Sequence, residues 1–216
     1  MYQLFYAPKS ASMGVRVMLE ELGQPYQLIE TSVDSNTPRP PEQLAINPNG
    51  WIPVLVWEGG AMYECAAITI FLGDRHSGQS NTASLSPAIT DPARALYLQT
   101  LVYFSNSIQN AFQLTYYPER FADTPAEHPG AQLRGNRRLT ETWSVINRQI
   151  GTNTWLLGDS FSLADIYLFM LTTWFRSSIG HPSVGAFPNV HRIANAVAER
   201  PSVQHVYAQW LANSQY

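Results

Sequence analysis

The sequence predicts two parts of different structure: an α/β part in the first third of the chain and an all-helical part in the remainder. Three observations carry this prediction. Short apolar runs alternate with a helical pattern up to residue 72, residues 73–92 are rich in Ser, Thr, Gly, Pro and Asp, and only helical patterns follow. We therefore expect an N-terminal domain at residues 1–76, a linker at 77–90 and a helical domain at 91–216.

The first part is predicted to form a strand, a helix, a second strand and then a hairpin. A helix that begins near Met13 ends at Gly23, with Pro25 just beyond, and it joins two apolar runs that we expect to pair in parallel. The pair Gly59-Gly60 predicts a tight reversal between two further strands. The expected strands are 2–6, 26–30, 54–57 and 61–63, and the expected helices are 13–22, 42–46 and 65–72.

The second part contains long helical patterns with clear start signals. Pro188 and Pro201 stand at helix starts, where the missing N–H group of proline is harmless. Ser162 and Asp165 have the spacing of a capping box, with Asp in place of the usual Glu or Gln. The expected helices run from about residue 91 onward and over 131–150, 163–177, 190–200 and 203–212.

Composition excludes several classes of function. The chain of 216 residues has a net charge of -3, so we expect neither nucleic acid nor an anionic membrane as a partner. No apolar run approaches the ~20 residues of a membrane span, and because the chain enters its first strand without a basic and then apolar segment, we expect no secretion signal. Cys65 is the single cysteine, which fits a reducing compartment and therefore a cytoplasmic location.

The dipeptide Ile52-Pro53 is the first candidate for a binding role. A proline that enters a strand from a turn is placed where a cis peptide bond is tolerated. A cis bond would expose the backbone of Ile52, with which an extended peptide ligand can pair as an added strand. On this dipeptide alone, however, a proline that merely starts an edge strand is the better interpretation.

Glu64 and Cys65, at the start of the helix expected at 65–72, are the second candidate. The acid can hold an amino group, and the free N–H groups of a helix start can hold a carboxylate. An amino acid head carries both groups. The ordinary interpretation is an acidic residue favoured at a helix start, followed by a cysteine that serves as a small buried apolar residue.

The loop after the first strand is the third candidate. Ser10 and Ser12 precede or begin the first helix, and Lys9, the only lysine, lies beside them. Serine hydroxyls at a helix start are usually caps, but they can also donate hydrogen bonds to a thiolate, whose pKa a helix N-terminus lowers.

The order of these segments resembles the N-terminal thioredoxin-like domain of the glutathione S-transferase superfamily, in a bacterial-type member. The run Asn-Pro-Asn-Gly-Trp-Ile-Pro-Val-Leu at 47–55 and the run Glu-Cys-Ala-Ala-Ile at 64–68 match two motifs of this superfamily. The run Gly-Asp-Ser-Phe-Ser-Leu-Ala-Asp-Ile at 158–166 matches its helical-domain capping segment. The resemblance covers essentially the whole chain.

The resemblance implies glutathione as a cosubstrate and no metal ion. Ile52 would pair with the cysteinyl part of glutathione, Pro53 would be the cis proline, and Glu64 and Cys65 would receive the γ-glutamyl head. Cys65 stands where serine is usual, and a thiol is a weaker donor than a hydroxyl. Trp51 stands where many relatives have a basic or polar residue, so Lys9 is a candidate to replace that residue at the glycyl end.

The catalytic residue and the acceptor pocket are predicted more broadly. Relatives activate the thiol with a tyrosine, serine or cysteine near the first loop; here Ser10 is the first choice, Ser12 the second and Tyr6 the third. The acceptor pocket is expected between the domains. Four residues near one helical face are candidates to line it, and the alternative is an interface or a partly exposed polar stripe: Tyr103, Asn106, Asn110 and Tyr117.

These inferences predict a glutathione transferase that activates the glutathione thiol for attack on a small hydrophobic electrophile, the chemistry of detoxification. The resemblance also implies a homodimer. Two alternatives stay open. The reaction on glutathione could instead be isomerisation, ether cleavage or disulfide reduction, or the chain could be a non-catalytic glutathione-binding protein, which the departures at Trp51 and Cys65 would favour.

Overall fold

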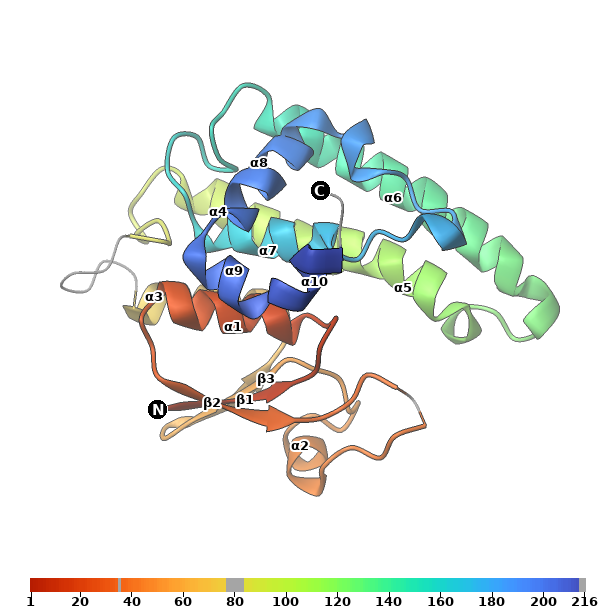
Figure 1. Ribbon diagram of the computed structural model, residues 1–216, viewed down its shortest axis with the longest axis horizontal. Helices are drawn as coiled ribbons and strands as arrows, with labels where there is room; N and C mark the ends of the chain where they lie inside the picture. Colours follow the sequence, from red (N-terminus) through yellow and green to blue (C-terminus); the bar gives the residue numbers. More distant parts are fainter. Residues whose placement is uncertain (35, 77–83, 214–216) are drawn as a thin grey trace.

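The computed structural model describes residues 1–34, 36–76 and 84–213, and in these it has the two predicted parts. A small sheet with its helices forms one layer, and a bundle of helices packs on one side of it (Figure 1). The fold class predicted from the sequence is therefore confirmed. Half of the stretch expected to be linker at 77–90, residues 77–83, lies outside the described residues.

The N-terminal domain is a four-stranded mixed sheet in the order β2-β1-β3-β4. Strand β1 pairs in parallel with β2, as the helical crossover between them requires, and antiparallel with β3. Strands β3 and β4 form the predicted hairpin, in which Trp57 pairs with Gly60 across the turn. The elements are β1 (Tyr2–Tyr6), α1 (Ser12–Glu21), β2 (Tyr26–Glu30), α2 (Pro41–Ile46), β3 (Val54–Trp57), β4 (Gly60–Tyr63) and α3 (Cys65–His76).

The C-terminal domain contains only helices in its described residues, as predicted. Pro188 and Pro201 are the first residues of their helices. The main helices are α4 (Arg94–Tyr103), α5 (Asn110–Tyr116), α6 (His128–Ile150), α7 (Leu163–Thr172), α8 (Pro188–Ala198), α9 (Pro201–Val206) and α10 (Ala208–Asn213); the π-helix η1 (Phe104–Gln109) joins α4 to α5, and short 3₁₀ turns are η2 (Pro118–Arg120), η3 (Pro125–Glu127), η4 (Ser177–Ile179) and η5 (Val184–Ala186).

Several helix boundaries differ from the predictions by up to three residues, and the differences are larger at three places. Helix α3 continues past Gly73 to His76, and the segment expected as one helix at 203–212 is divided at Tyr207 into α9 and α10. Helix α7 ends at Thr172 instead of residue 177. There the hydroxyls of Thr172 and Thr173 donate back to carbonyls of the last turn, and the chain leaves the helix toward the interdomain cavity.

The capping box of α7 is confirmed, and it is buried. Both carboxylate oxygens of Asp165 accept hydrogen bonds: Oδ1 from the N–H of Leu156 at 2.9 Å, and Oδ2 from the N–H and hydroxyl of Ser162 at 2.8 Å. Burial raises the pKa of Asp165 to about 6, and these hydrogen bonds oppose the rise. The box anchors the start of a helix whose ten residues are all buried.

Helix α1 is packed between the sheet and the helical domain (Figure 1). Seven of its ten residues are buried, which is too many for a helix with only one covered face. Gly14 permits the close approach to α7, since a Cβ atom at this position would lie 2.6 Å from Sδ of Met170. The two domains are thus held together through the body of one helix.

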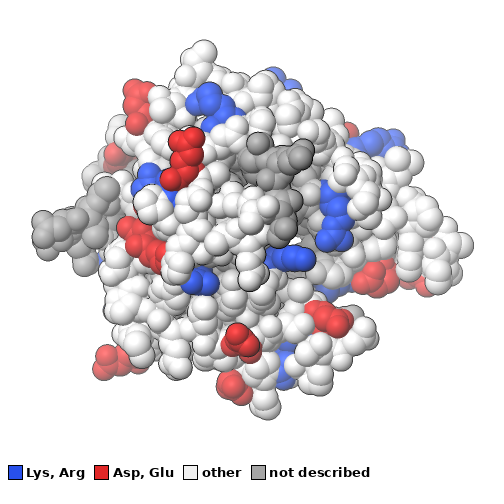
Figure 2. Space-filling model, in the orientation of Figure 1, with Lys and Arg blue, Asp and Glu red and all other residues white. Residues whose placement is uncertain are grey.

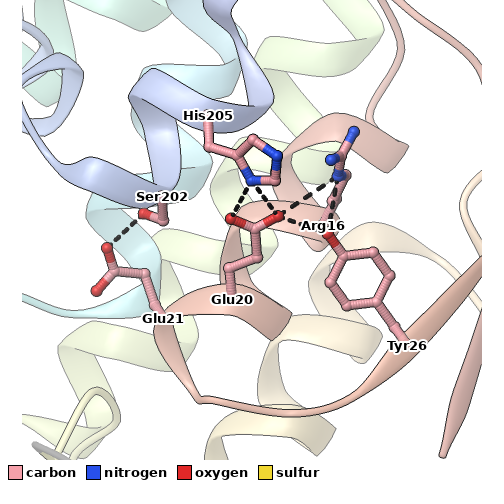
Figure 3. Close-up of polar contacts among 6 residues, drawn as sticks. All are labelled: Arg16, Glu20, Glu21, Tyr26, Ser202 and His205. Atoms are coloured by element: carbon pink, nitrogen blue, oxygen red, sulfur yellow. Dashed lines mark hydrogen bonds and ion pairs between the residues drawn. The ribbon is translucent and has the colours of Figure 1, made fainter.

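Polar contacts fasten the C-terminal end of α1 to α9 (Figure 3). The carboxylate of Glu20 contacts the ring of His205 at 3.0 Å and also accepts a hydrogen bond from the hydroxyl of Tyr26. Glu21 forms a two-point ion pair with Arg200, whose Nε–H bond to the carboxylate is 2.8 Å long. Burial would raise the pKa of Glu21, but hydrogen bonds from Arg200 and from Ser202 outweigh it and hold the pKa below its usual value.

No helix among residues 1–34, 36–76 and 84–213 is long and apolar enough to cross a membrane.

Replacing Asp165 by alanine is expected to lower the free energy of unfolding by about 2 to 4 kcal/mol, because two buried N–H groups and a hydroxyl lose their acceptor. Urea unfolding followed by circular dichroism measures the loss. The exposed Asp123 provides the matched control, Asp123→Ala, which should change the unfolding midpoint little. An equal, small effect of both substitutions would contradict the role given to the buried box.

Candidate functional site

A cavity of about 960 Å³ lies between the two domains. The N-terminal domain contributes the loop after β1, the loop before β3 and the start of α3. The helical domain contributes α5 with the turn before it, the loop after α7, and α10. The cavity is lined by eight of the twelve residues predicted for the site: Lys9, Ser10, Trp51, Ile52, Pro53, Glu64, Cys65 and Tyr117.

The loop before β3 is fixed by buried amide side chains. Asn47 donates from Nδ2 to the carbonyl of Trp51 at 3.1 Å, and Gln43 donates from Nε2 to the carbonyl of Gly50 at 2.9 Å. Gly50 has a φ of +71°, a conformation that favours glycine. Arg39 donates to the same carbonyl from Nε at 3.1 Å. These hydrogen bonds therefore define the shape of the loop.

The peptide bond between Ile52 and Pro53 is cis, the geometry that the resemblance implies. Ile52 lines the cavity, and within the described residues its backbone N–H and C=O make no hydrogen bond. Strand β3 begins only at Val54. An extended ligand lying along this segment thus finds one unused donor and one unused acceptor, as an added strand requires.

The start of α3 presents Glu64 to the cavity. Glu64 is exposed and has a φ of +75°, which is uncommon for a residue other than glycine. The N–H groups of the first turn behind it have no acceptor within the helix. A carboxylate beside free N–H groups can hold the ammonium and carboxylate groups of one amino acid head.

Cys65 lines the same part of the cavity but is 97% buried, since only 3% of its surface is exposed. Burial raises the pKa of its thiol to about 12, although hydrogen bonds with the hydroxyls of Tyr167 and Thr69 oppose the rise. The thiol is therefore protonated at neutral pH. A protonated, buried thiol is a poor nucleophile, so the geometry favours a packing and donor role for Cys65.

The two serine candidates occupy different positions. Ser10 lines the cavity, whereas Ser12 lies beneath it and is fully buried. Their hydroxyls are 2.7 Å apart, and Ser10 Oγ donates to the carbonyl of Ala7 at 2.8 Å. Ser12 Oγ accepts the N–H of Ala7 at 3.1 Å, which makes it part of the loop's framework. Of the two, only the Ser10 hydroxyl can turn toward a ligand.

Tyr6, the third candidate, does not line the cavity. Its ring lies 5.7 Å from the guanidinium of Arg16, at the end of β1. This contact with Arg16 indicates a packing role for Tyr6.

The helical wall of the cavity differs from the predicted one. Of the four acceptor candidates, only Tyr117 lines it. Asn106 and Asn110 are exposed to solvent, and the hydroxyl of Tyr103 donates to the carbonyl of Thr142 on α6. The residues of η1 and α5 that line this wall are Ser105, Gln109, Phe112, Gln113 and Tyr116.

The difference between the predicted and the observed lining residues follows from the winding of the helix. Residues 104–109 form a π-helix, in which each N–H bonds five residues back, so the faces of the helix shift relative to regular α periodicity. Gln109 lies in the shifted turn, and its side-chain oxygen accepts the hydroxyl of Tyr167 from α7. Only the three-dimensional path shows which face meets the cavity.

The helical side of the cavity is aromatic. Phe112 makes edge contacts with Trp174 and with Phe175, at ring separations of 5.6 and 5.4 Å. Behind these rings His181 packs against Phe112 at 5.4 Å and against Tyr116 at 5.3 Å. Flat apolar surfaces of this kind suit a planar, weakly polar ligand.

Arg120 is a site residue that the sequence interpretation missed. Its guanidinium lies 5.2 Å from the centre of the Trp51 ring and 4.0 Å from that of Tyr117. The contacts join the loop before β3 to the helical domain across the cavity mouth. No local pattern marks Arg120, because its contact with Trp51 joins two segments that are far apart in the sequence.

The cavity is positively charged, although the chain carries a net charge of -3. Four basic residues line it (Lys9, Arg39, Arg120 and Arg176) against one carboxylate, that of Glu64. In the described part of the chain, none of the four has a carboxylate within 4.0 Å. Figure 2 shows basic side chains on both sides of the hollow between the domains. The field inside favours anions.

Comparison with known proteins identifies the family. The family model described as the N-terminal domain of glutathione S-transferase matches residues 4–80, and the model of the C-terminal domain matches residues 106–201. Together they cover most of the chain, which belongs to the glutathione S-transferase superfamily.

Individual relatives are distant but extend over the whole length. The chain is 26% identical over 207 residues to glutathione S-transferase GstA of Escherichia coli O157:H7, covering 94% of this chain and 95% of that protein. It is 27% identical over 209 residues to the uncharacterised protein YncG of E. coli K12, covering 95% and 97%. The crystal structure of a glutathione transferase homologue from Sulfitobacter with bound glutathione superposes with a TM-score of 0.84, at 25% identity over 97% of this chain and 98% of that one.

His181 predicts a pH dependence of stability. It is 6% exposed, accepts the N–H of Arg176 at Nδ1 and contacts the hydroxyl of Thr115 at Nε2; burial lowers its pKa to about 4, against 6.5 in an unfolded chain. Because the unfolded state then binds the proton more readily, stability is present above pH 6.5 and is lost as the pH falls. We expect protonation of His181 to lower the free energy of unfolding by about 2 kcal/mol when the pH is lowered from 7 to 5.

Urea unfolding at both pH values tests this expectation. His181→Gln should remove most of the pH-dependent loss, whereas His128→Gln, at the first residue of α6, should keep it. Comparison with the variants cancels the contribution of other titrating groups. Parallel curves for wild type and His181→Gln would contradict the assignment.

Proposed function

We propose that this chain binds glutathione in the interdomain cavity and joins it, through its sulfur, to a small hydrophobic electrophile held by the helical domain. The observation that carries the proposal is the composition of one cavity. Glu64, the unused backbone groups of Ile52 and the hydroxyl of Ser10 lie along one side, and an aromatic wall lies along the other. The bound glutathione reported for the Sulfitobacter homologue supports the same assignment.

Glutathione would lie along the loop before β3. Its γ-glutamyl head would be held by Glu64 and the first turn of α3, and its cysteinyl backbone would pair with Ile52. A tripeptide extended in this way has its glycyl carboxylate near Trp51, beside the guanidinium of Arg120. Arg120 and Lys9 are therefore the candidates to bind that carboxylate, in place of a basic residue at position 51.

The protein would activate glutathione by stabilising its thiolate form. Ser10 Oγ–H would turn from the carbonyl of Ala7 to donate to the thiolate, and the N–H groups of Ser10 and Ala11 make no hydrogen bond within the described residues. The basic side chains around the cavity add a favourable field. The thiol proton passes to solvent, the sulfur lone pair forms the bond to carbon, and the leaving group departs with its electron pair.

Three further features belong to this proposal. We propose domains at 1–76 and 91–216 joined by residues 77–90, a homodimer, and a location in the cytoplasm, where glutathione is reduced. Sedimentation equilibrium of the purified chain measures the oligomeric state. Sedimentation as a monomer would overturn the dimer without touching the assignment of the glutathione site.

The function is tested by glutathione binding and turnover together. We expect calorimetric binding of glutathione and conjugation of 1-chloro-2,4-dinitrobenzene, with affinity about tenfold weaker in Glu64→Gln because one charged hydrogen bond to the ammonium is lost. Glu58→Gln, an exposed acid in the β3–β4 turn, is the matched control. Binding without turnover of several electrophiles would overturn the transferase proposal and leave a glutathione-binding protein; no binding would overturn both.

Ser10→Ala is expected to raise the pKa of the bound glutathione thiol by about one unit, since one hydrogen bond to the thiolate disappears. The ultraviolet absorbance of the thiolate, followed against pH in the protein–glutathione complex, measures this value. The effect on the pH profile of kcat/KM should be the same. A rise in Ser12→Ala with none in Ser10→Ala would reverse the assignment of the two serines.

A further inference from the structure

One cation of the cavity makes no direct contact with glutathione in the proposed binding mode. Arg39 donates to the carbonyls of Gly50, Asp34 and Thr37, and it thereby supports the loop before β3. Arg120 and Lys9 lie at the glutathione side. Arg176 comes from the loop after α7, on the aromatic side, and in the described part of the chain no carboxylate lies within ion-pair distance of it.

The backbone of Arg176 is held firmly. Its N–H donates to Nδ1 of His181 at 3.0 Å, and its carbonyl accepts the N–H groups of Ile179 and His181. His181 is itself fixed by Thr115 through Nε2, at 2.8 Å. The loop therefore presents the arginine from a defined point, although the side chain is exposed to solvent.

The side chain of Arg176 lies against the aromatic wall. Its guanidinium is 5.5 Å from the centre of the Tyr116 ring. The neighbours before it in the sequence, Trp174 and Phe175, line the cavity with Phe112. A flat apolar surface thus ends at a single positive charge with five N–H donors.

We propose that the electrophile conjugated in this cavity is a planar aromatic compound that carries a carboxylate or a similar anionic group, and that Arg176 binds this group. The ring would pack on Phe112, Tyr116 and Trp174 while the anion reaches the guanidinium. Arginine suits the task because its planar fork matches a carboxylate. This inference rests on the proposed glutathione transfer and adds the substrate class to it.

The reaction with such a compound is balanced without any further reactant. For 4-chloro-3-nitrobenzoate, the glutathione sulfur bonds to the ring carbon that carries chlorine, the carbon–chlorine bond breaks and chloride leaves with the electron pair. The thiol proton passes to solvent. The carboxylate does not react, so it is free to serve for recognition.

Product binding tests the inference without depending on turnover. The two probes are S-(4-carboxy-2-nitrophenyl)glutathione and its uncharged carbamoyl counterpart, titrated into the full chain by calorimetry. We expect wild type to prefer the carboxy conjugate by about tenfold, and Arg176→Met to lose this preference while its affinity for glutathione alone stays within about twofold. Arg176→Lys should keep part of the preference, because it keeps the charge.

A matched control variant makes the outcomes distinct. Arg137→Met removes an equal charge from the exposed surface of α6 and should leave the preference intact. Equal affinities of wild type for the two conjugates would overturn the inference, and so would a preference that survives in Arg176→Met or a matching loss of glutathione affinity. Absence of any binding of glutathione would instead overturn the proposed function on which the inference rests.

Discussion

The burial of helix α1 on both sides is the constraint on which the rest of this structure depends. One face covers the sheet and the other packs on α7, where Gly14 permits contact with Met170. Because Ser10 lies just before α1, this packing fixes its hydroxyl relative to the aromatic wall that follows α7. The ion pair between Glu21 and Arg200 fastens the other end of the same helix. The distance between the Ser10 loop and the aromatic wall is thereby set by a rigid element, as the proposed reaction between groups on two domains would require.

Charge is distributed in a way that suits chemistry on an anion. The chain as a whole is weakly acidic, but the cavity collects basic side chains that no carboxylate neutralises in the described residues. Each unpaired cation lowers the free energy of a thiolate, and the partial burial of the cavity strengthens that effect relative to open water. Trp51 carries no charge, but its ring contacts the guanidinium of Arg120 and thereby places a positive charge at the mouth of the cavity.

The aromatic wall is stiffened from behind by a neutral histidine. His181 is almost fully buried among Phe112, Tyr116 and Phe175, and its two ring nitrogens are both engaged. Burial of an uncharged imidazole is tolerable, whereas burial of the charged form is costly, which is why its pKa falls. The same residue fixes the loop that carries Arg176, so the shape and the charge of the acceptor side have a common support.

The sequence by itself determined the features that depend on neighbouring residues. These include the strands and helices of the N-terminal domain, the hairpin, the helix starts at Pro188 and Pro201, and the capping box of Ser162 and Asp165. Turn chemistry, hydrophobic period and missing N–H groups act over a few residues and are visible in the chain. Only the tertiary structure decided that Ser10 faces the cavity while Ser12 does not, that Asn106 and Asn110 point away from it, and that Arg120 and Arg176 belong to it. These positions follow from the winding of the π-helix and from the packing of segments that are far apart in the sequence. Such contacts leave no local pattern in the sequence.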